Sequence, residues 1–345
     1  ISETRNQLSV PLLRAAESEV VEAVQHVNKV AAEVKKLEET AKLYMRYQRI
    51  LNVPVTTFDD LDAVMRDSLL MSKLWTGLQS WGKESEHWFA TAVHAVDAEA
   101  LTLQVRTFQR TVVQCERGLQ GGNDAVALLK SMVGEFAGLL PAVSGLRCDK
   151  LRDRHWAQIH DILGVEVQAD PEFTVGQLVA LQVTSEAPTV ARIALEATHE
   201  AVLEDMLDKL EETWSGFELE VLPYKGRKAN MILGSTEEVD STLDDSMVVV
   251  NTVLSSRYVA AVRSRVDHWK RRLVLLRSTL DEWTLCQKNW MYLENVFMTS
   301  QDIQKQLPRE FKLFLGVDES FKAIMRQTDR YRNVLEAGTR PGLRE

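Results

Sequence analysis

Large apolar residues recur at alternating steps of three and four in the C-terminal quarter of the chain. They are Val259, Val262, Val266, Trp269, Leu273, Leu276, Leu280 and Trp283, followed by Trp290, Leu293 and Phe297. Side chains at these spacings share one face of a helix, so the pattern predicts a long amphipathic helix near residues 257–297. Roughly forty residues at 1.5 Å each make a rod on the order of 60 Å long. Such a rod indicates a mechanical or scaffolding part rather than a pocket.

The same periodicity predicts further helices upstream. One runs from about Glu17 to Leu51 and ends at Asn52-Val53-Pro54, because the residue before a proline avoids the helical region. Thr57 and Asp60 have the spacing of a capping box that opens the next helix. Four more helices are expected: Leu101 to Leu119, stopped by Gly121-Gly122; Asp124 onward, closed by Pro141; Leu151 to Ile162; and one opened by Pro188.

Between two predicted helices the period changes from helical to alternating. Apolar Phe217, Leu219 and Val221 are separated by single residues, which is typical of a strand. Residues 223–226 supply a turn, and residues 229–233 can return as a second strand. Thr236 is then placed to cap the following helix. We therefore expect a mainly α protein, an elongated array of packed helical bundles with one β-hairpin insertion near residues 217–233.

Composition narrows the class of protein. At 345 residues the chain should form two or three packed subdomains, and eight prolines and sixteen glycines are few enough for a helical protein. No run of eighteen apolar residues predicts a membrane span, and the start at Ile1, without Met, indicates a segment of a longer protein. The three cysteines, Cys115, Cys148 and Cys286, have no metal-ligand spacing. A net charge of −9 argues against nucleic-acid binding.

The long helix carries one basic set, which consists of Arg263, Arg265, Lys270, Arg271, Arg272 and Arg277. Two interpretations stay open for it: a solvated face opposite the apolar seam, or a surface for an acidic protein partner. Gln287 also has two interpretations, because it occupies a seam position between Trp283 and Trp290. It fixes the register of packing, or it marks a partly exposed end of the seam.

Motifs of known catalytic chemistry are missing from the sequence. There is no G-x-x-x-x-G-K-S/T loop, no G-x-S-x-G elbow and no H-E-x-x-H helix. Glu84-x-x-His87 and Glu196-x-x-His199 have the spacing used by di-iron helical bundles, although solvated helix faces produce the same pattern. We expect no catalytic, cofactor or metal site. Six tryptophans on apolar stripes are expected to pack in the core: Trp75, Trp156, Trp214, Trp269, Trp283 and Trp290.

The order of residues along the C-terminal half is similar to the linker region of dynein heavy chains. Trp283, Gln287, Trp290, Tyr292, Leu293, Glu294 and Phe297 match a W-x-x-x-Q-x-x-W-x-Y-L-E-x-x-F signature. Gln306-Leu307-Pro308 continues it, and Arg154-His155-Trp156 resembles an upstream R-H-W block. The resemblance covers about Trp75 to Met325, and Ser256-Arg257-Tyr258-Val259 looks more like axonemal than cytoplasmic chains.

The resemblance implies a non-catalytic lever in a microtubule motor of a cilium or flagellum, or more widely of the cytoplasmic cytoskeleton. In that family ATP and Mg are bound by an AAA+ ring of the same heavy chain, and microtubules by a stalk. The tail and its associated chains would be further partners. It also implies that residues 1–70 form a neck leading to the tail, residues 71–165 a first linker subdomain and residues 166–345 a second.

Two functional hypotheses follow from the lever interpretation. A compliant hinge is expected at Met298, Thr299, Ser300 and Pro308, where the long helix breaks. A ring contact is expected at the basic hairpin turn, through Lys225, Arg227 and Lys228. The rival interpretations are a helical scaffold or tether that binds other proteins, for which internal repeats are missing, and the di-iron bundle.

Overall fold

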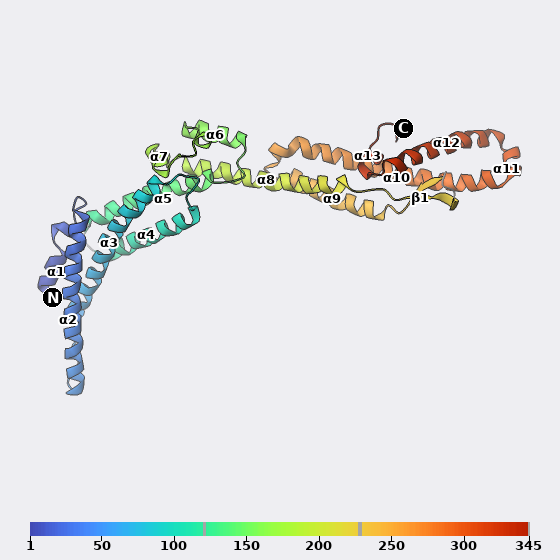
Figure 1. Cartoon of the computed structure of the whole chain (residues 1–345). Coiled ribbons are helices and arrows are strands. Elements are labelled where there is room, and N and C mark those ends of the chain that lie inside the picture. Colours follow the sequence, from blue (N-terminus) through green and yellow to red (C-terminus); the bar gives the residue numbers. More distant parts are fainter. Residues whose placement is uncertain (120–121, 227–229, 344–345) are drawn as a thin grey trace. The chain divides into compact units, whose positions relative to one another are not determined.

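The computed structural model describes residues 1–119, 122–226 and 230–343. The chain divides into two compact units, Ile1–Ala197 and Thr198–Glu345, and the division falls inside helix α8 (Ala187–Ser215). Nearly all of the described elements are helices, and the described strands form one small antiparallel sheet (Figure 1). The predicted fold class, mainly α with one β-hairpin, is therefore confirmed. The functional division into a neck and two linker subdomains stays a prediction.

Unit 1 is a set of helices that pack side by side. Its elements are α1 (Ser2–Leu8), α2 (Val20–Ile50), α3 (Asp59–Ala90), α4 (Ala98–Gly118), α5 (Asp124–Leu146), α6 (Asp153–Leu163), α7 (Val175–Ala180) and the start of α8. Short 3₁₀ turns lie at Pro11–Leu13 and Val167–Ala169. Helix α3 packs on α2 with its first part and on α4 and α5 further along. Asp97 and Asn123 cap α4 and α5, each accepting from two backbone N–H groups.

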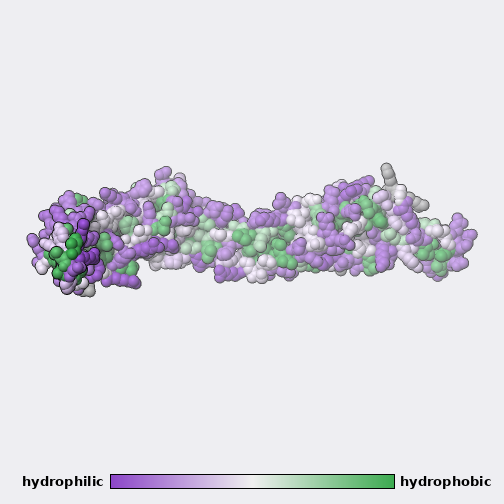
Figure 2. Space-filling view, turned by 90° about the horizontal axis from the view of Figure 1, so that it is seen from below, coloured by the Kyte–Doolittle hydropathy of each residue, from purple (hydrophilic) through white to green (hydrophobic). Residues whose placement is uncertain are grey.

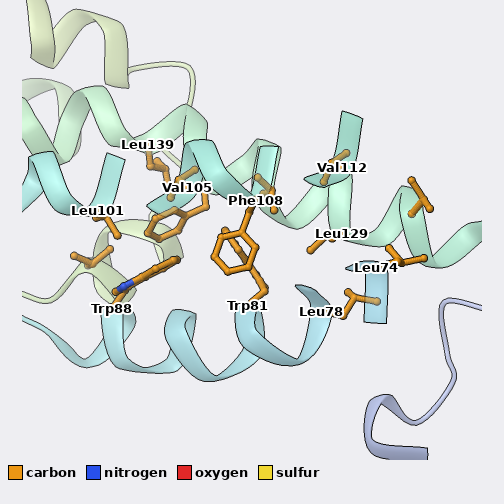
Figure 3. Close-up of a cluster of buried hydrophobic side chains, with 14 of the residues drawn as sticks. Leu74, Leu78, Trp81, Trp88, Leu101, Val105, Phe108, Val112, Leu129 and Leu139 are labelled. Atoms are coloured by element: carbon orange, nitrogen blue, oxygen red, sulfur yellow. The ribbon is translucent and has the colours of Figure 1, made fainter. Parts of the chain in front are cut away.

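Aromatic rings fill the core where α3, α4 and α5 meet. The Trp81 ring lies edge-on to Phe108 at a centroid distance of 5.2 Å, and Trp88 stacks on Phe136 at 5.3 Å. Figure 3 shows Trp81, Trp88 and Phe108 surrounded by aliphatic side chains of the neighbouring helices. Such aromatic pairs add to the free energy of simple burial, so they fix the spacing of these helices as well as closing the core.

Helix α5 corrects the prediction that Pro141 ends it, because the helix continues to Leu146. The proline removes one backbone hydrogen bond, which costs about 3 kcal/mol in a helix interior. Val143 and Leu146 beyond it are buried, and full burial of such side chains contributes roughly 1.5–3 kcal/mol each. Gly145 also allows a close approach to α8, since a Cβ there would lie 3.2 Å from the carbonyl oxygen of Val190. Together these contacts offset the lost bond.

Among the described residues, α5 is the single helix that is long and apolar enough to cross a membrane. Its apolar side chains do not form an outward face. Leu129, Val133, Phe136 and Leu139 are all buried in the core of unit 1. We therefore interpret α5 as the central helix of a packed bundle, the usual explanation for one such helix.

Two predicted helix starts are wrong in detail. No side chain caps α3, whose N-cap is Phe58 rather than Thr57, because the side chain of Gln48 holds the preceding loop through Thr56. The long helix α10 begins at Arg263, and Val259–Val262 form a 3₁₀ turn. That turn completes a tight reversal after α9, which leaves too little length for a regular helical turn. The predicted stop at Gly121-Gly122 lies partly outside the described residues.

Unit 2 is built around α10 (Arg263–Thr299), which packs against most of the other elements of the unit. The other elements are the end of α8, β1 (Val221–Pro223), β2 (Met231–Leu233), α9 (Glu237–Ser255), α11 (Gln301–Gln306), α12 (Pro308–Arg330) and α13 (Val334–Gly338). A 3₁₀ turn at Tyr224–Gly226 follows β1. The predicted seam of α10 is buried: its members from Val262 to Trp283, and then Trp290 and Phe297, are at most 6% exposed.

The strands β1 and β2 pair in antiparallel register, with Val221 opposite Leu233 and Pro223 opposite Met231. The backbone N–H of Gly234 donates to the Glu220 carbonyl oxygen, and that of Tyr224 donates to Asn230. Hydrogen-bonded and non-hydrogen-bonded pairs alternate in an antiparallel ladder. The Val221–Leu233 pair is therefore non-hydrogen-bonded, and the backbone N–H and C=O of Leu233 point away from β1.

Candidate functional site: a clamp on the long helix

Three signature side chains of α10, Gln287, Trp290 and Glu294, lie on one face of the helix because they are three and four residues apart. Each contacts a different element of unit 2: β2, α12 and the hairpin turn. We call these three residues and their direct partners the clamp. It connects α10 to β2, α12 and the hairpin turn by polar contacts.

The Gln287 side-chain amide pairs with the free edge of β2 in the way that a neighbouring strand would. Its Oε1 accepts from the N–H of Leu233 at 2.7 Å, and its Nε2 donates to the carbonyl oxygen of Leu233 at 2.9 Å. These are the two backbone groups of Leu233, which β1 does not reach. A primary amide has one acceptor and donors in the same plane, so it can pair with both groups as a peptide unit would. Of its two predicted interpretations, the structure supports the fixing of register.

Glu294 is buried, with 4% of its side chain exposed, and its carboxylate receives the ammonium group of Lys225. Lys225 also donates to Oδ1 of Asn295 at 2.6 Å. Hydrogen bonding to Glu294 raises the pKa of the Lys225 ammonium above its ordinary value. The turn that delivers Lys225 has left-handed backbone at Lys225 (φ 52°) and Gly226 (φ 69°). A lysine in that conformation is uncommon, and the ion pair helps to stabilise it.

Trp290 joins α10 to α12 and to the hairpin. Its indole N–H donates to Oδ1 of Asp318 at 3.0 Å, and Lys322 donates to the other oxygen of that carboxylate at 2.7 Å. Its ring stacks on Phe321, with centroids 4.5 Å apart, and lies 5.3 Å from the Tyr224 ring. The buried carboxylate is thus satisfied on both sides, and a single side chain of α10 holds two elements.

Burial decreases beyond Phe297, where the hinge was predicted. The Phe297 ring stacks on Phe314 of α12. Helix α10 ends at Thr299, Ser300 is extended, and α11 has no buried residue among its six. Pro308 occupies the first turn of α12, where its missing N–H costs nothing. The predicted hinge residues therefore lie around a short helix with no fully buried residue, which contacts the core of unit 2 through half-buried Ile303.

The other signature residues are distributed more widely. Trp269 and Trp283 are buried in unit 2, and Nε1 of Trp283 has no hydrogen-bond partner among the described residues. Tyr292 points outward and is 69% exposed. In unit 1, His155 is buried and its Nδ1 accepts from the N–H of Arg152, which closes the first turn of α6. Trp156 is half-buried beside an open hollow and packs against the edge of the unit 1 core, so it is less enclosed than its predicted place in the core.

The predicted ring contact divides into two parts. Arg227 and Lys228 lie outside the described residues, whereas Lys225 has an internal role in the clamp. Three of the six residues of the basic set on α10, Arg263, Arg265 and Arg277, form ion pairs within the described part of unit 2. Arg265 contacts Asp208 and Glu211 of α8, at 2.6 and 2.7 Å. Helix-to-helix pairing of this kind was not among the two interpretations of the set, because spacing along one helix does not reveal acidic residues on its neighbours.

The two Glu-x-x-His pairs do not assemble into a metal site in the described part of the chain. No group of three or more His, Cys, Asp or Glu side chains there could hold a metal ion. The His199 ring instead stacks flat on Tyr258, with centroids 4.5 Å apart. Sequence reasoning missed Lys225–Glu294 and Trp290–Asp318. Their signal was the acidic residues within an otherwise apolar seam, Glu294 and Asp318.

Comparison with known proteins gives a consistent result. Residues 61–345 match the family model "Dynein heavy chain, N-terminal region 2". Dynein axonemal heavy chain 6 of Homo sapiens is 38% identical over 320 residues, which is 92% of this chain and 8% of that protein. Dynein axonemal heavy chain 1 of Homo sapiens is 30% identical over 317 residues, and the Dynein-1-beta heavy chain of the flagellar inner arm I1 complex of Chlamydomonas reinhardtii is 29% identical over 299. The chain spans less than a tenth of the length of these relatives.

Proposed function

This chain belongs to the dynein heavy chain family, within its N-terminal region 2, and we propose that it serves there as a non-catalytic mechanical linker. The relatives are axonemal, so the chain is a component of a dynein motor of the cilium or flagellum. The linker would couple changes in an ATP-driven AAA+ ring to displacement of the tail. ATP and Mg, the ring, the tail and the microtubule-binding stalk would all belong to other parts of the same motor.

The clamp is the observation that carries this proposal. A lever must transmit force between elements that are far apart in sequence, and it needs contacts that resist sliding. Hydrogen bonds and ion pairs with fixed geometry resist sliding better than apolar packing does, because they are directional. Gln287, Trp290 and Glu294 supply such contacts to three elements from one helix. Each of these three side chains forms a hydrogen bond or an ion pair with a partner within unit 2.

Compliance belongs at the predicted hinge. We propose that the stretch from Met298 to Pro308 yields first under load, because α11 buries no residue and local opening costs least where few apolar contacts must break. Amide hydrogen exchange tests this directly. The amides of Met298 to Leu307 should exchange at least about tenfold faster than those of Arg263 to Trp283, and Pro308 has no amide hydrogen. Equal protection of the two stretches would refute the hinge hypothesis.

The lever role is tested in the full-length heavy chain. Trp290→Phe keeps an aromatic ring at this position but loses the indole N–H that donates to Asp318. It should lower the microtubule gliding velocity by about half or more, while ATP hydrolysis per motor stays within about twofold. Leu285→Ser changes an exposed residue of the same helix and is the matched control. A parallel fall of velocity and hydrolysis, or ATP hydrolysis by the isolated 345-residue chain, would refute the proposal.

A further inference from the structure

On the face seen in Figure 2, hydrophilic residues predominate and hydrophobic residues form smaller groups. Specific binding at such a surface depends on charges that are placed to match a partner. A hollow of about 390 Å³ in unit 1 has a mainly polar lining, which includes Arg5, Arg14, Arg66 and one acidic residue, Asp67. We call these four residues and the space between them the arginine hollow. The whole chain has a net charge of −9, so positive charge gathers here against the average of the sequence.

The three arginines come from separate segments of the chain. Arg5 lies on α1, Arg14 follows the 3₁₀ turn Pro11–Leu13, and Arg66 lies in the first half of α3. They are therefore not the solvated face of a single amphipathic helix. Folding brings three like charges to one hollow, where they repel one another. An anionic ligand between them would replace that repulsion with attraction.

Most of the guanidinium donors at the hollow are unused within the described part of the chain. Arg5 donates through Nη2 to Oδ1 of Asp60 at 3.0 Å, and the two side chains of this pair are 49% and 77% exposed. An exposed ion pair contributes only about 0–1 kcal/mol, so a ligand can compete with Asp60 for Arg5. Among the described residues, Arg14 and Arg66 form no ion pair and no side-chain hydrogen bond, although Asp62 lies one turn before Arg66.

The backbone that carries Arg14 is held in place. Its N–H donates to the carbonyl oxygen of Pro11 at 3.0 Å, and its own carbonyl oxygen accepts from the N–H of Ala125 in α5 at 3.2 Å. The preceding residue, Leu13, is fully buried, and its carbonyl oxygen accepts from the indole N–H of Trp75 at 3.3 Å. A site on a fixed backbone loses less conformational entropy when it binds a ligand than a mobile loop would.

The guanidinium groups identify the ligand as an oxyanion. Each presents its N–H donors in a planar fork that pairs with two oxygens of a phosphate or a carboxylate. A phosphate monoester has three acceptor oxygens and a charge of about −1.5 to −2 at pH 7. It therefore makes fuller use of three arginines than a singly charged carboxylate does.

Asp67 restricts the ligand further. Its carboxylate is half-buried in the lining, forms no ion pair or side-chain hydrogen bond with a described residue, and repels a bare anion. It can accept from a hydrogen-bond donor that lies next to the phosphate, and the backbone N–H groups beside a phosphorylated serine or threonine are such donors. A nucleotide base would need a ring on which to stack, and no aromatic residue is among the described residues that line the hollow.

We propose that the arginine hollow binds a phosphorylated serine or threonine within a peptide segment. The phosphate lies between Arg14 and Arg66, Arg5 exchanges Asp60 for a phosphate oxygen, and Asp67 accepts from the peptide backbone. A volume of about 390 Å³ holds a phosphorylated side chain together with part of its neighbours, and it lies within the range of about 300–1,000 Å³ for ligand pockets. This binding site is independent of the lever role, because the hollow belongs to unit 1 and the clamp to unit 2.

The test uses the whole 345-residue chain and a fluorescently labelled peptide with a central phosphoserine flanked by glycines and alanines. The same peptide with unmodified serine is the comparison. In fluorescence anisotropy the phosphorylated peptide should bind at least about tenfold more tightly than the unmodified one. Arg14→Gln and Arg66→Gln should each weaken its binding by about tenfold. Arg14→Lys keeps the charge but loses the planar fork, so it should restore only part of the affinity.

Asp67→Asn tests the selection of a peptide over a bare anion. Unlabelled inorganic phosphate should displace the phosphorylated peptide poorly from the parent chain, because Asp67 repels it. The asparagine removes that repulsion, so inorganic phosphate should compete at least about fivefold better in the variant. Equal competition in the parent and in Asp67→Asn would overturn the assignment of a peptide ligand.

Arg106→Gln is the matched control, because Arg106 is an exposed arginine of α4 outside the hollow. It should leave binding unchanged, and circular dichroism should show the same helix content in every variant. The proposal fails if the phosphorylated peptide does not bind at about 1 mM, or if both peptides bind equally. It fails if Arg106→Gln weakens binding as much as Arg14→Gln. It also fails if phosphoinositide vesicles bind the parent more tightly than the peptide and lose that binding in Arg14→Gln, since a lipid headgroup would then be the ligand.

Discussion

Gln287→Leu removes the amide that pairs with β2 while keeping a side chain of similar length. Two hydrogen bonds are lost, and each contributes about 0.5–1.5 kcal/mol net. Leu233 is 3% exposed, so leucine at position 287 also leaves its N–H and C=O without water. An unsatisfied buried group costs about 1–3 kcal/mol. We therefore expect the hairpin to lose roughly 2–4 kcal/mol of its stability against local opening from α10.

Amide hydrogen exchange measures this loss at individual positions. Since 1.4 kcal/mol corresponds to a factor of ten, the Leu233 amide should exchange roughly 30- to 700-fold faster in the variant. The Gly234 amide is an internal reference, because its bond to Glu220, the residue before β1, does not involve Gln287. It should change less than that of Leu233. Gln104→Leu on the exposed face of α4 controls for the change of residue type.

Equal protection of Leu233 in the variant and the parent would refute the reasoning. It would mean that packing alone holds β2 on α10 and that the amide contacts add nothing. Equal acceleration at Leu233 and Gly234 would mean that the sheet opens as one piece. The edge pairing deduced from the register would then have no separate energetic role.

Two further predictions concern stability. Lys225→Met leaves the buried Glu294 carboxylate without its ion-pair partner and should destabilise unit 2 in denaturant unfolding. Breaking a buried pair costs about 3–5 kcal/mol, and the loss here should be smaller to the extent that water reaches the exposed Lys225 side of the pair. The folded-state pKa of Lys225 is raised, so its contribution to stability is complete below about pH 10.4 and is lost as pH rises through the raised value. The stabilities of parent and variant should therefore converge only in strong alkali. A constant difference between them up to about pH 12 would contradict this. Gly176→Ala should destabilise unit 1 by about 1–3 kcal/mol, since a Cβ there would lie 2.8 Å from the backbone oxygen of Phe89. The control is Gly134→Ala, whose Cβ would meet nothing within 4 Å and which should not destabilise unit 1. Equal melting temperatures for the two alanine variants would contradict the close approach at Gly176.

Local pattern determined much of the fold. Trp269, Leu273 and Leu276 lie on one face of α10 because helical geometry alone places residues at those spacings together, whatever packs against them. The turn residues after Val221 were likewise sufficient to predict a hairpin, although β1 begins only at Val221 and the alternating stretch before it bridges to Asn333 through Glu218. The order of the signature residues along the chain was by itself enough to indicate the dynein family.

Tertiary structure decided which partners these faces meet. Gln287 lies 54 residues from Leu233 and Lys225 lies 69 from Glu294, so no local period connects them. Helix α5 continues past Pro141 because Val143 and Leu146 find a core that the local sequence does not contain. Propensity and spacing act over one or two turns, whereas burial and the pairing of polar groups depend on chain segments brought together only by folding.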